Sequence, residues 1–397
     1  MSGPYLLTHY KNMSGGVLRL SKSPFPSLSF SRHGSLRFKP FLIERFGPRL
    51  LMSVGSILVG LSWIFSARVD HVFSLYWSYG VLGGIGSGII YVGVVGLMVR
   101  WFPRRRGLAA GLVAAGYGAG AIFTTFPIAT MIASSGYAHA LSVFGLIQGA
   151  VGLIAAQGLI KAPAATDFSQ GREIRTMRSY GPLQMLKTAP FWWLFAMMTM
   201  MSTSGLMIVS EVGPIAKDYG VENALVLGVA ALPLSLTLSR FTNGLTRPFF
   251  GWVSDHIGRE NTMLLAFSLE ALSILLLIAF VGNPVLFVIL TGLAFFGWGE
   301  IFSLFPSTLT DFYGSEHATM NYGMLYMAQG VGALLGGPLS ASLDAVANSW
   351  TPVFLIVVTM DIVTAVLAVT VLKRIHRKWN VDISSELSEV EDAVKNS

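Results

Sequence analysis

The sequence predicts an all-α, polytopic membrane protein with about ten transmembrane helices, and three observations support this fold class. Apolar residues make up 53% of the 397 residues, whereas charged residues make up only 12%, about half the share usual in soluble proteins. Apolar runs of roughly 20 residues, the length that crosses a bilayer as a helix, recur along the chain. The basic residues fall in the short segments between those runs, as membrane topology requires.

The predicted spans are separated by short polar segments or by turns that contain glycine or proline. The 43 glycines and nine tryptophans of the chain are typical of helices that pack closely within a membrane. The predicted bounds are about 49–67, 73–99, 107–133, 137–160, 188–215, 223–251, 261–281, 284–310, 319–344 and 350–372.

Positive charge alternates from one loop to the next along these spans. Every second loop is rich in arginine and lysine, as at residues 100–106, whereas the intervening loops carry only Arg68 and Lys217 near helix ends. The positive-inside rule puts the basic loops, and with them the N- and C-terminal ends, in the cytoplasm. The sequence therefore predicts a multi-pass protein of a cell membrane, either plasma or inner. Nucleic-acid binding is not expected despite the net charge of +7, because the basic residues do not form one patch.

Two internal similarities indicate that the chain consists of two related halves. Residues 44–49 (ERFGPR) resemble residues 255–260 (DHIGRE), and residues 116–119 (GYGA) resemble residues 330–333 (GVGA). The members of the two pairs lie about 211 and about 214 residues apart. Repeated halves are typical of membrane transporters, in which the substrate site lies between them.

The repeat also reveals a gap in the first half. The second half has two predicted helices before its copy of the loop, whereas no uncharged run in residues 1–47 is long enough to span a membrane. We therefore expect the first half to lack its first two helices. The predicted regions are an atypical Ser-rich basic segment (1–47), a four-helix N-terminal bundle (48–160), a cytoplasmic linker (161–187), a C-terminal six-helix bundle (188–374) and a cytoplasmic tail (375–397).

The N-terminal segment has two interpretations. Its serine-rich, basic composition, with no acidic residue before Glu44, resembles that of a transit peptide. The same segment is also consistent with an aberrant gene model, or with a truncated copy joined to unrelated sequence. We favour the second interpretation.

Several motifs resemble those of a known family. The acid-x-x-Gly-[Arg/Pro] loops at 44–48 and 255–259 resemble the signature loops of the major facilitator superfamily. Residues 100–111 (RWFPRRRGLAAG), 243–252 (NGLTRPFFGW) and 304–307 (LFPS) are similar to the oxalate/formate antiporter family, which is related to monocarboxylate transporters. The similarity covers about residues 41–378. It implies two pseudo-symmetric helical bundles that rock about a central cavity, so that the substrate site opens to each side of the membrane in turn.

The resemblance also implies a gate and a binding site. Asp255 and Arg259 would form a charge latch that closes the inner gate, and the first half would carry a degraded copy of it, with Pro40 in place of the usual glycine. The family's anion site has one basic residue on the eighth helix and another on the eleventh. Arg247 matches the first, whereas Gln329 stands where a lysine is expected. The gate motif residues are Glu44, Arg45, Gly47, Asp255, Gly258 and Arg259.

Helix geometry puts Arg247 near the middle of the membrane. It lies eight residues from Asp255, or about 12 Å along a helix that rises about 1.5 Å per residue. An arginine at the bilayer centre costs at least ~2.5 kcal/mol, so we expect it to face a cavity, where its planar guanidinium matches a carboxylate. The alternative is a structural salt bridge with Glu300. Arg240, seven residues earlier on the same helical face, is a candidate entrance charge, or it extends to the surface.

The remaining candidate site residues lie at similar depth on other helices. Aromatic residues match the family's pocket positions and would enclose a small anion, although ordinary helix packing is the alternative for any one of them. Gln329 completes the predicted site as an uncharged donor. The aromatic candidates are Tyr91, Tyr117, Trp298, Phe302 and Tyr326.

Charge at the site bears on substrate and coupling. A site with one cation neutralises one carboxylate, so the sequence predicts a preference for monocarboxylates over oxalate. Glu300 is a candidate proton-coupling residue, unless it forms a fixed pair with Arg247. Three further acids in the predicted spans, Glu211, Glu270 and Asp361, receive no transport role and are expected at solvated helix ends or in pairs between the bundles.

These residues predict a secondary active transporter of small organic anions, working as an antiporter or a proton symporter. Its partners would be a small carboxylate anion, the lipid bilayer and, for symport, a proton; we expect a monomer. The alternative is a degenerate or non-transporting family member, such as an anion-binding sensor or a truncated paralogue. An enzyme is not expected, nor a cofactor or a metal site, because catalytic patterns are lacking and the seven histidines are scattered.

Overall fold

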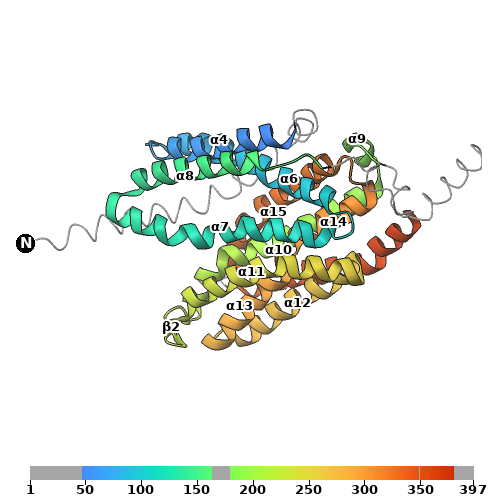
Figure 1. The fold of residues 1–397 in the computed structure, drawn as a ribbon. Helices are drawn as coiled ribbons and strands as arrows, with labels where there is room; N and C mark the ends of the chain where they lie inside the picture. The colour runs from blue at the N-terminus through green and yellow to red at the C-terminus, as the bar shows by residue number, and fades with distance from the viewer. Residues whose placement is uncertain (1–46, 163–178, 348, 380–397) are drawn as a thin grey trace, which may run out of the picture.

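The first half is built from long helices that run back and forth past one another. The computed structural model of the protein describes residues 47–162, 179–347 and 349–379. Residues 1–46, with Glu44 and Arg45, lie outside the described residues, as do most of the predicted linker and the tail from residue 380. The helices of the first half are α4 (Pro48–Ser66), α5 (Val72–Leu75), which continues through a π-helical section (Tyr76–Gly83) into α6 (Gly84–Trp101), α7 (Arg106–Ser135) and α8 (Tyr137–Gln157) (Figure 1).

The second half is larger and contains most of the buried core. Its predicted span at 284–310 is divided by a break at Gly299 and Glu300, and its predicted span at 223–251 begins only at Ala231, after a two-stranded antiparallel hairpin. Its elements are α9 (Pro182–Met185), α10 (Ala189–Asp218), β1 (Leu225–Val226), β2 (Val229–Ala230), α11 (Ala231–Ile257), α12 (Arg259–Phe280), α13 (Pro284–Trp298), α14 (Ile301–Tyr313), α15 (Ala318–Ala347) and α16 (Thr351–Leu367), which a π-helical section (Ala368–Leu372) extends.

Each predicted span contains at least one helix. Eight segments of the described chain are long and apolar enough to cross a membrane, by length and composition. The two other predicted spans are α11 and α15, which are 27 and 30 residues long but are not among those eight. These are the helices that carry Arg247 and Gln329. Polar residues on helices that line a site between bundles account for their weaker hydropathy.

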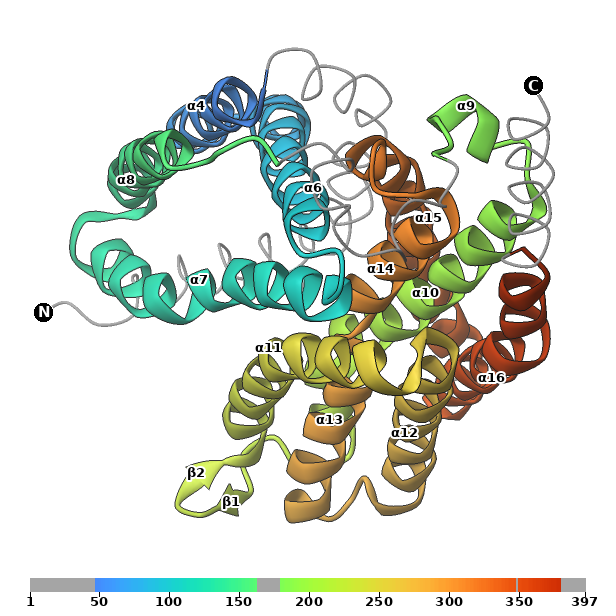
Figure 2. The ribbon, with the colours of Figure 1, turned by 45° about the vertical axis from the view of Figure 1, so that its right-hand side comes forward.

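The two halves meet at one end of the molecule and diverge toward the other (Figure 2). Near its beginning, α7 lies against α11 and α14, while α6 lies against α15. We call this the basic end, because the arginine-rich segment 100–106 lies there, and the opposite end the distal end. Toward the distal end α7 separates from α11, and its aromatic residues Phe123 and Phe126 are 77% and 78% exposed.

Glycine allows the close approach of α7 and α11. A β-carbon added at Gly111 would collide with the backbone of Arg247, and one added at Gly107 would collide with the carbonyl oxygen of Gly251. Small residues at helix contacts let backbones approach within a membrane, where dispersion rather than the hydrophobic effect favours helix association. This seam therefore has no room for a larger side chain.

Gly111→Val should force α7 and α11 apart at the basic end. Distances between helix axes vary between about 8 and 10 Å with the side chains at the contact, so we expect a separation of about 2 Å. Because the chain has no cysteine, spin labels can be attached at Arg104→Cys and His256→Cys, two exposed positions in different halves. Electron spin resonance would then measure the distance between them.

Gly116→Val is the matched control, since it lies on the same helix and a β-carbon added there meets nothing within 4 Å. An unchanged distance distribution in Gly111→Val, or an equal change in both variants, would show that the contact at Gly111 does not set the distance between α7 and α11.

Candidate functional site

Arg247 lies buried where the two halves meet. Its guanidinium donates through Nη1 to the carbonyl oxygen of Ala114 on α7 at 2.5 Å, and through Nη2 to Oδ1 of Asn243 at 2.7 Å. Its Nε has no hydrogen-bond partner among the described residues. No described carboxylate lies within ion-pair distance, so the alternative salt bridge with Glu300 is not formed in this structure. The positive charge is held by neutral groups and is not compensated by a pair.

The structure brings all five predicted aromatic residues together beside Arg247. The guanidinium carbon lies 4.7 Å from the ring centroid of Phe302. The Tyr91 ring lies 5.1 Å from Tyr117, 5.2 Å from Tyr326 and 6.3 Å from Phe302. Trp298 joins the group through Phe302, at 5.9 Å. We call these five residues the aromatic cluster; it includes side chains from both halves.

One more aromatic residue, missed by the sequence analysis, extends this cluster. The Tyr322 ring lies 5.4 Å from that of Tyr326. Both residues are on α15, four positions apart and therefore on one face of the helix. The four-residue spacing of these two tyrosines is the sequence pattern from which Tyr322 could have been predicted. Tyr117, on α7, is 45% exposed, so the cluster is not closed on the side of the first half.

Gln329 lies on the same helix but faces α10. Its side-chain oxygen accepts a hydrogen bond from the hydroxyl of Ser202 at 2.5 Å, and the residue is buried. The amide is therefore oriented with its oxygen toward α10. Arg240, in contrast, is exposed on α11 and lies outside the aromatic cluster.

Glu300 occupies the break between α13 and α14, where the sequence analysis expected a continuous helix. Its backbone carbonyl accepts from the amides of Ser303 and Leu304, at 2.8 and 2.9 Å, so the residue begins α14. The side chain is fully buried, and neither carboxylate oxygen has a hydrogen-bond partner among the residues that the structure describes. A β-carbon at the neighbouring Gly299 would collide with Thr246 of α11, so the break fits closely against that helix.

The expected positions of the three other acids were wrong. Glu270 and Asp361 are 1% and 0% exposed and lie inside the second half, neither at a solvated helix end nor between bundles. Glu211 is also buried, and its Oε1 accepts from the hydroxyls of Ser340 at 2.9 Å and Ser210 at 3.1 Å. Helical periodicity did not reveal this, because these helices are apolar around most of their circumference.

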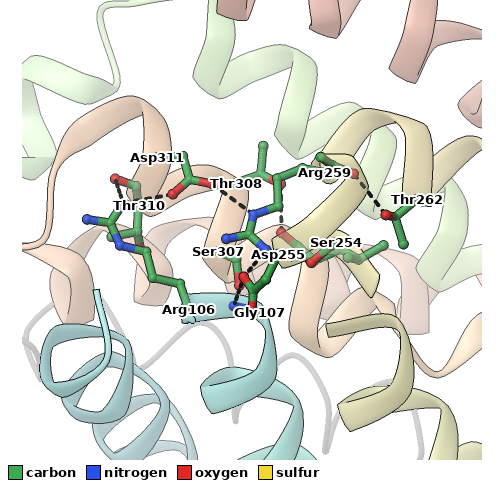
Figure 3. A network of polar contacts seen from close by, with 12 residues as sticks. Arg106, Gly107, Ser254, Asp255, Arg259, Thr262, Ser307, Thr308, Thr310 and Asp311 are labelled. Carbon is green, nitrogen blue, oxygen red and sulfur yellow. Dashed lines mark hydrogen bonds and ion pairs between the residues drawn. The ribbon is translucent and has the colours of Figure 1, made fainter. Parts of the chain in front are cut away.

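A network of charges joins the two halves at the basic end (Figure 3). Both carboxylate oxygens of Asp255, at the end of α11, accept from backbone amides at the start of α7, those of Gly107 and Leu108, each at 3.0 Å. This carboxylate therefore caps α7 and also interacts favourably with the positive end of its helix dipole. An aspartate of the second half thus holds a helix of the first.

Two arginines extend the network. Arg259 on α12 donates to Asp255 at 2.6 Å and to Asp311 on α14 at 2.8 Å. Arg106, the first residue of α7, donates to the other oxygen of Asp311 at 2.7 Å. Asp311 thus bridges arginines from both halves. Glycine at 258, where φ is 91°, permits the sharp turn between α11 and α12, and Gly47 has a similar φ of 81° before α4.

The predicted gate residues Asp255, Gly258 and Arg259 therefore lie together, whereas Glu44 and Arg45 lie outside the described residues. Arg106 and Asp311 were missed as members of the network. Their charge next to a predicted span was visible in the sequence, but their partners were not.

Asp311→Asn should weaken closure of the basic end, because it leaves two buried arginines without their shared carboxylate. Breaking one partner of a buried ion pair costs about 3–5 kcal/mol, enough to change which conformation dominates. The same spin labels at positions 104 and 256 should show a longer, broader distance distribution. Glu316→Gln, which neutralises a nearby exposed acid, should leave it unchanged; an identical response of both variants would refute the role of Asp311.

Comparisons with known proteins agree with this architecture. The model of the Major Facilitator Superfamily matches residues 40–241 and 214–389. The chain is 33% identical over 380 residues to an oxalate:formate antiporter of Oxalobacter formigenes, an alignment that covers 95% of this chain and 88% of the relative. It is 28% identical over 330 residues to monocarboxylate transporter 11 of Mus musculus, covering 79% and 70%.

The fold is also found in solved structures. The proton:xylose symporter XylE superimposes with a TM-score of 0.67 at 14% identity, covering 90% of this chain and 87% of that one. At that identity the likeness concerns the fold alone. The relatives are transporters rather than enzymes, as the sequence analysis predicted. This chain is therefore a multi-pass membrane transporter that belongs to the major facilitator superfamily.

Proposed function

We propose that this transporter moves small organic anions by alternating access, and that Arg247 binds the substrate carboxylate. The observation that carries the proposal is a buried arginine, with no ion-pair partner among the described residues, at the contact between the two halves. The names of two relatives, an oxalate:formate antiporter and a monocarboxylate transporter, support the same substrate class.

The contacts of Arg247 favour a carboxylate ligand. A buried charge is costly unless it is paired, and the neutral acceptors Ala114 and Asn243 satisfy its hydrogen bonds without neutralising it. A carboxylate would supply both the missing charge and a planar acceptor that matches the guanidinium. Binding there would also engage both halves, since Ala114 belongs to α7 and Arg247 to α11.

The aromatic cluster favours small ligands. Its rings lie close to one another, and that of Phe302 lies against Arg247, which gives an aromatic wall on one side of the guanidinium. Three of the five side chains are tyrosines, whose hydroxyl groups can both donate and accept hydrogen bonds. We infer a carboxylate with few further atoms, of the size of formate or a short hydroxy or keto acid.

The neutral Gln329 favours a monocarboxylate over oxalate. Its amide oxygen is engaged by Ser202, so the group can offer an N–H donor to an anion but no positive charge. A second carboxylate would therefore be buried without a counter-ion. One cation in the site matches one negative charge on the substrate.

The network around Asp255 supports a role as the inner gate, closed in this structure. The contacts between the halves that the structure describes gather at the basic end, while α7 and α11 diverge distally (Figure 2). By the positive-inside rule the basic end faces the cytoplasm, in a plasma or inner membrane. We infer an outward-facing conformation of a monomer, which works either as an antiporter or as a proton symporter with Glu300 as the proton-binding residue.

One observation favours a second candidate function, a protein that binds anions without moving them. Tyr117 is 45% exposed and Phe123 77% exposed, so α7 lacks cover from the described part of the first half. A flank that is open to lipid would hinder alternating access. Binding without uptake would identify this alternative.

Arg247→Ala should abolish saturable uptake of labelled formate into proteoliposomes. Truncating one partner of a buried, hydrogen-bonded charge pair costs about 2–5 kcal/mol, or more than about tenfold in affinity. Arg68→Ala, which removes an exposed arginine at a helix end, should retain uptake. Formate binding can be followed in parallel through tryptophan fluorescence, because Trp298 belongs to the aromatic cluster. Uptake that survives in Arg247→Ala would contradict the proposed site.

Gln329→Lys should shift the preference toward oxalate. A hydrogen bond to a charged group contributes about 1.5–3 kcal/mol, so oxalate uptake should rise about tenfold or more relative to formate. The ratio of the two uptake rates in competition measures this directly. Gln329→Met, of similar length but without charge, is the control; an unchanged ratio in Gln329→Lys would mean that Gln329 does not face the substrate.

A further inference from the structure

Three carboxyl groups are buried in the interior of the second half. They come from three different segments: Glu270 from α12, Glu300 from the break before α14, and Asp361 from α16. Their side chains are 1%, 0% and 0% exposed. The side chain of Glu270 packs against Gly297, three residues before Glu300. The helix α16, which carries Asp361, lies against α12. We call these three residues the acidic cluster.

The described residues provide this cluster with few partners. Both carboxylate oxygens of Glu300, both of Asp361 and Oε2 of Glu270 accept no hydrogen bond within the described chain. The hydroxyl of Ser204 on α10 lies next to Asp361, and Arg247 on α11 is the cation whose charge reaches Glu300. Three buried ionised carboxylates with one distant cation would be costly, because each lacks both water and a counter-ion.

A small cavity lies beside Glu270. It is lined by Gly205, Ile208, Glu270, Ala294, Phe295 and Trp298. Four of these residues have no polar side-chain atom. The fifth, Trp298, already donates its indole N–H to the carbonyl oxygen of Met201 at 2.8 Å. The carboxyl group of Glu270 is therefore the group in the lining that still lacks a hydrogen-bond partner among the described residues, at its Oε2. A water molecule or a proton that enters the cavity would bind there.

Two glycines shape this cavity. A β-carbon added at Gly297 would lie 2.7 Å from the side chain of Glu270, and one added at Gly205 would collide with the indole of Trp298. Glycine at these positions therefore lets α12 approach α13 and lets Trp298 reach α10. The close packing holds the Glu270 carboxyl group against the cavity, away from lipid.

The acidic cluster is physically connected to the proposed anion site. Trp298 forms a wall of the cavity and also contacts Phe302, whose ring lies under the Arg247 guanidinium. Glu300 follows Trp298 by two residues and senses the charge of Arg247. A carboxylate bound to Arg247 would cancel that charge, so Glu300 would lose this favourable positive potential.

We propose that Glu270, Glu300 and Asp361 together form a proton-binding site in the core of the second half, and that an anion on Arg247 promotes its occupation. This proposal rests on the proposed function and extends it from the single residue Glu300 to a shared site. The proton comes from water and binds a carboxylate oxygen, so that one anion and one proton enter the protein with no net change in charge.

Infrared difference spectroscopy tests the proposal on the purified full-length protein in lipid. Formate, the probe, should induce a carbonyl band of a protonated carboxylic acid in the wild-type protein. Glu300→Gln, Glu270→Gln and Asp361→Asn, which keep side-chain shape and remove a proton-binding oxygen, should each abolish or markedly reduce that band. Glu211→Gln is the matched control, because Glu211 is a buried acid of the same half that accepts hydrogen bonds from two serines.

A formate-induced band that persists in all three variants, or that is lost equally in Glu211→Gln, would overturn the proposal. So would wild-type protein that binds formate, by tryptophan fluorescence, and develops no such band.

A second measurement needs neither formate nor a variant. Raising the pH of the wild-type protein without substrate should remove a protonated-carboxyl signal, as the protons leave the coupled carboxyl groups. If the wild-type protein showed no such titrating signal, the acidic cluster would not be a proton-binding site. A titrating cluster in a protein that does not bind formate would refute the proposed substrate instead, so the two failures can be distinguished.

Discussion

Asp255 joins the two halves of this transporter, and the arrangement of the other charges follows from that contact. Its carboxylate caps the first turn of α7 and pairs with Arg259, which in turn reaches Asp311 and, through it, Arg106. Each buried charge at the basic end therefore has an opposite charge beside it. Because the network consists of compensated pairs, it stabilises one relative position of the halves without leaving a binding site for ions.

The centre of the molecule shows the opposite arrangement. Arg247 has neutral hydrogen-bond partners, and the acidic cluster has almost none within the described chain. An uncompensated buried charge destabilises a fold, so its presence is better explained by a ligand that completes it. A carboxylate for Arg247 and a proton for the acids would each remove part of this cost. Binding of one would then favour binding of the other.

The charge network at the basic end and the proposed anion site both lie on α7 and α11. A movement of one helix against the other therefore affects both. Gly111 of α7 lies against the backbone of Arg247, and Ala114, less than one turn further, accepts a hydrogen bond from its side chain. One turn in the other direction, the amide of Gly107 donates to Asp255. Any rocking of α7 against α11 must therefore alter both the anion contacts and the network at the basic end. A ligand that bridges Ala114 and Arg247 would act on the same seam.

The sequence by itself determined the fold class and the family, and it predicted the two related halves and most residues of the proposed anion site. Hydropathy and charge are local properties, so they could be read along the chain, and the motifs around Arg247 and Asp255 carried the family resemblance. Only the tertiary structure decided the partners: Arg106 with Asp311, Gln329 with Ser202, and Asp255 with the backbone amides of Gly107 and Leu108. Contacts of this kind depend on how each helix is rotated about its axis, and an apolar helix has no polar face from which that rotation can be inferred. The break at Gly299 and Glu300 was hidden for the same reason, because its flanks are continuous in hydropathy and its cause is close packing against Thr246.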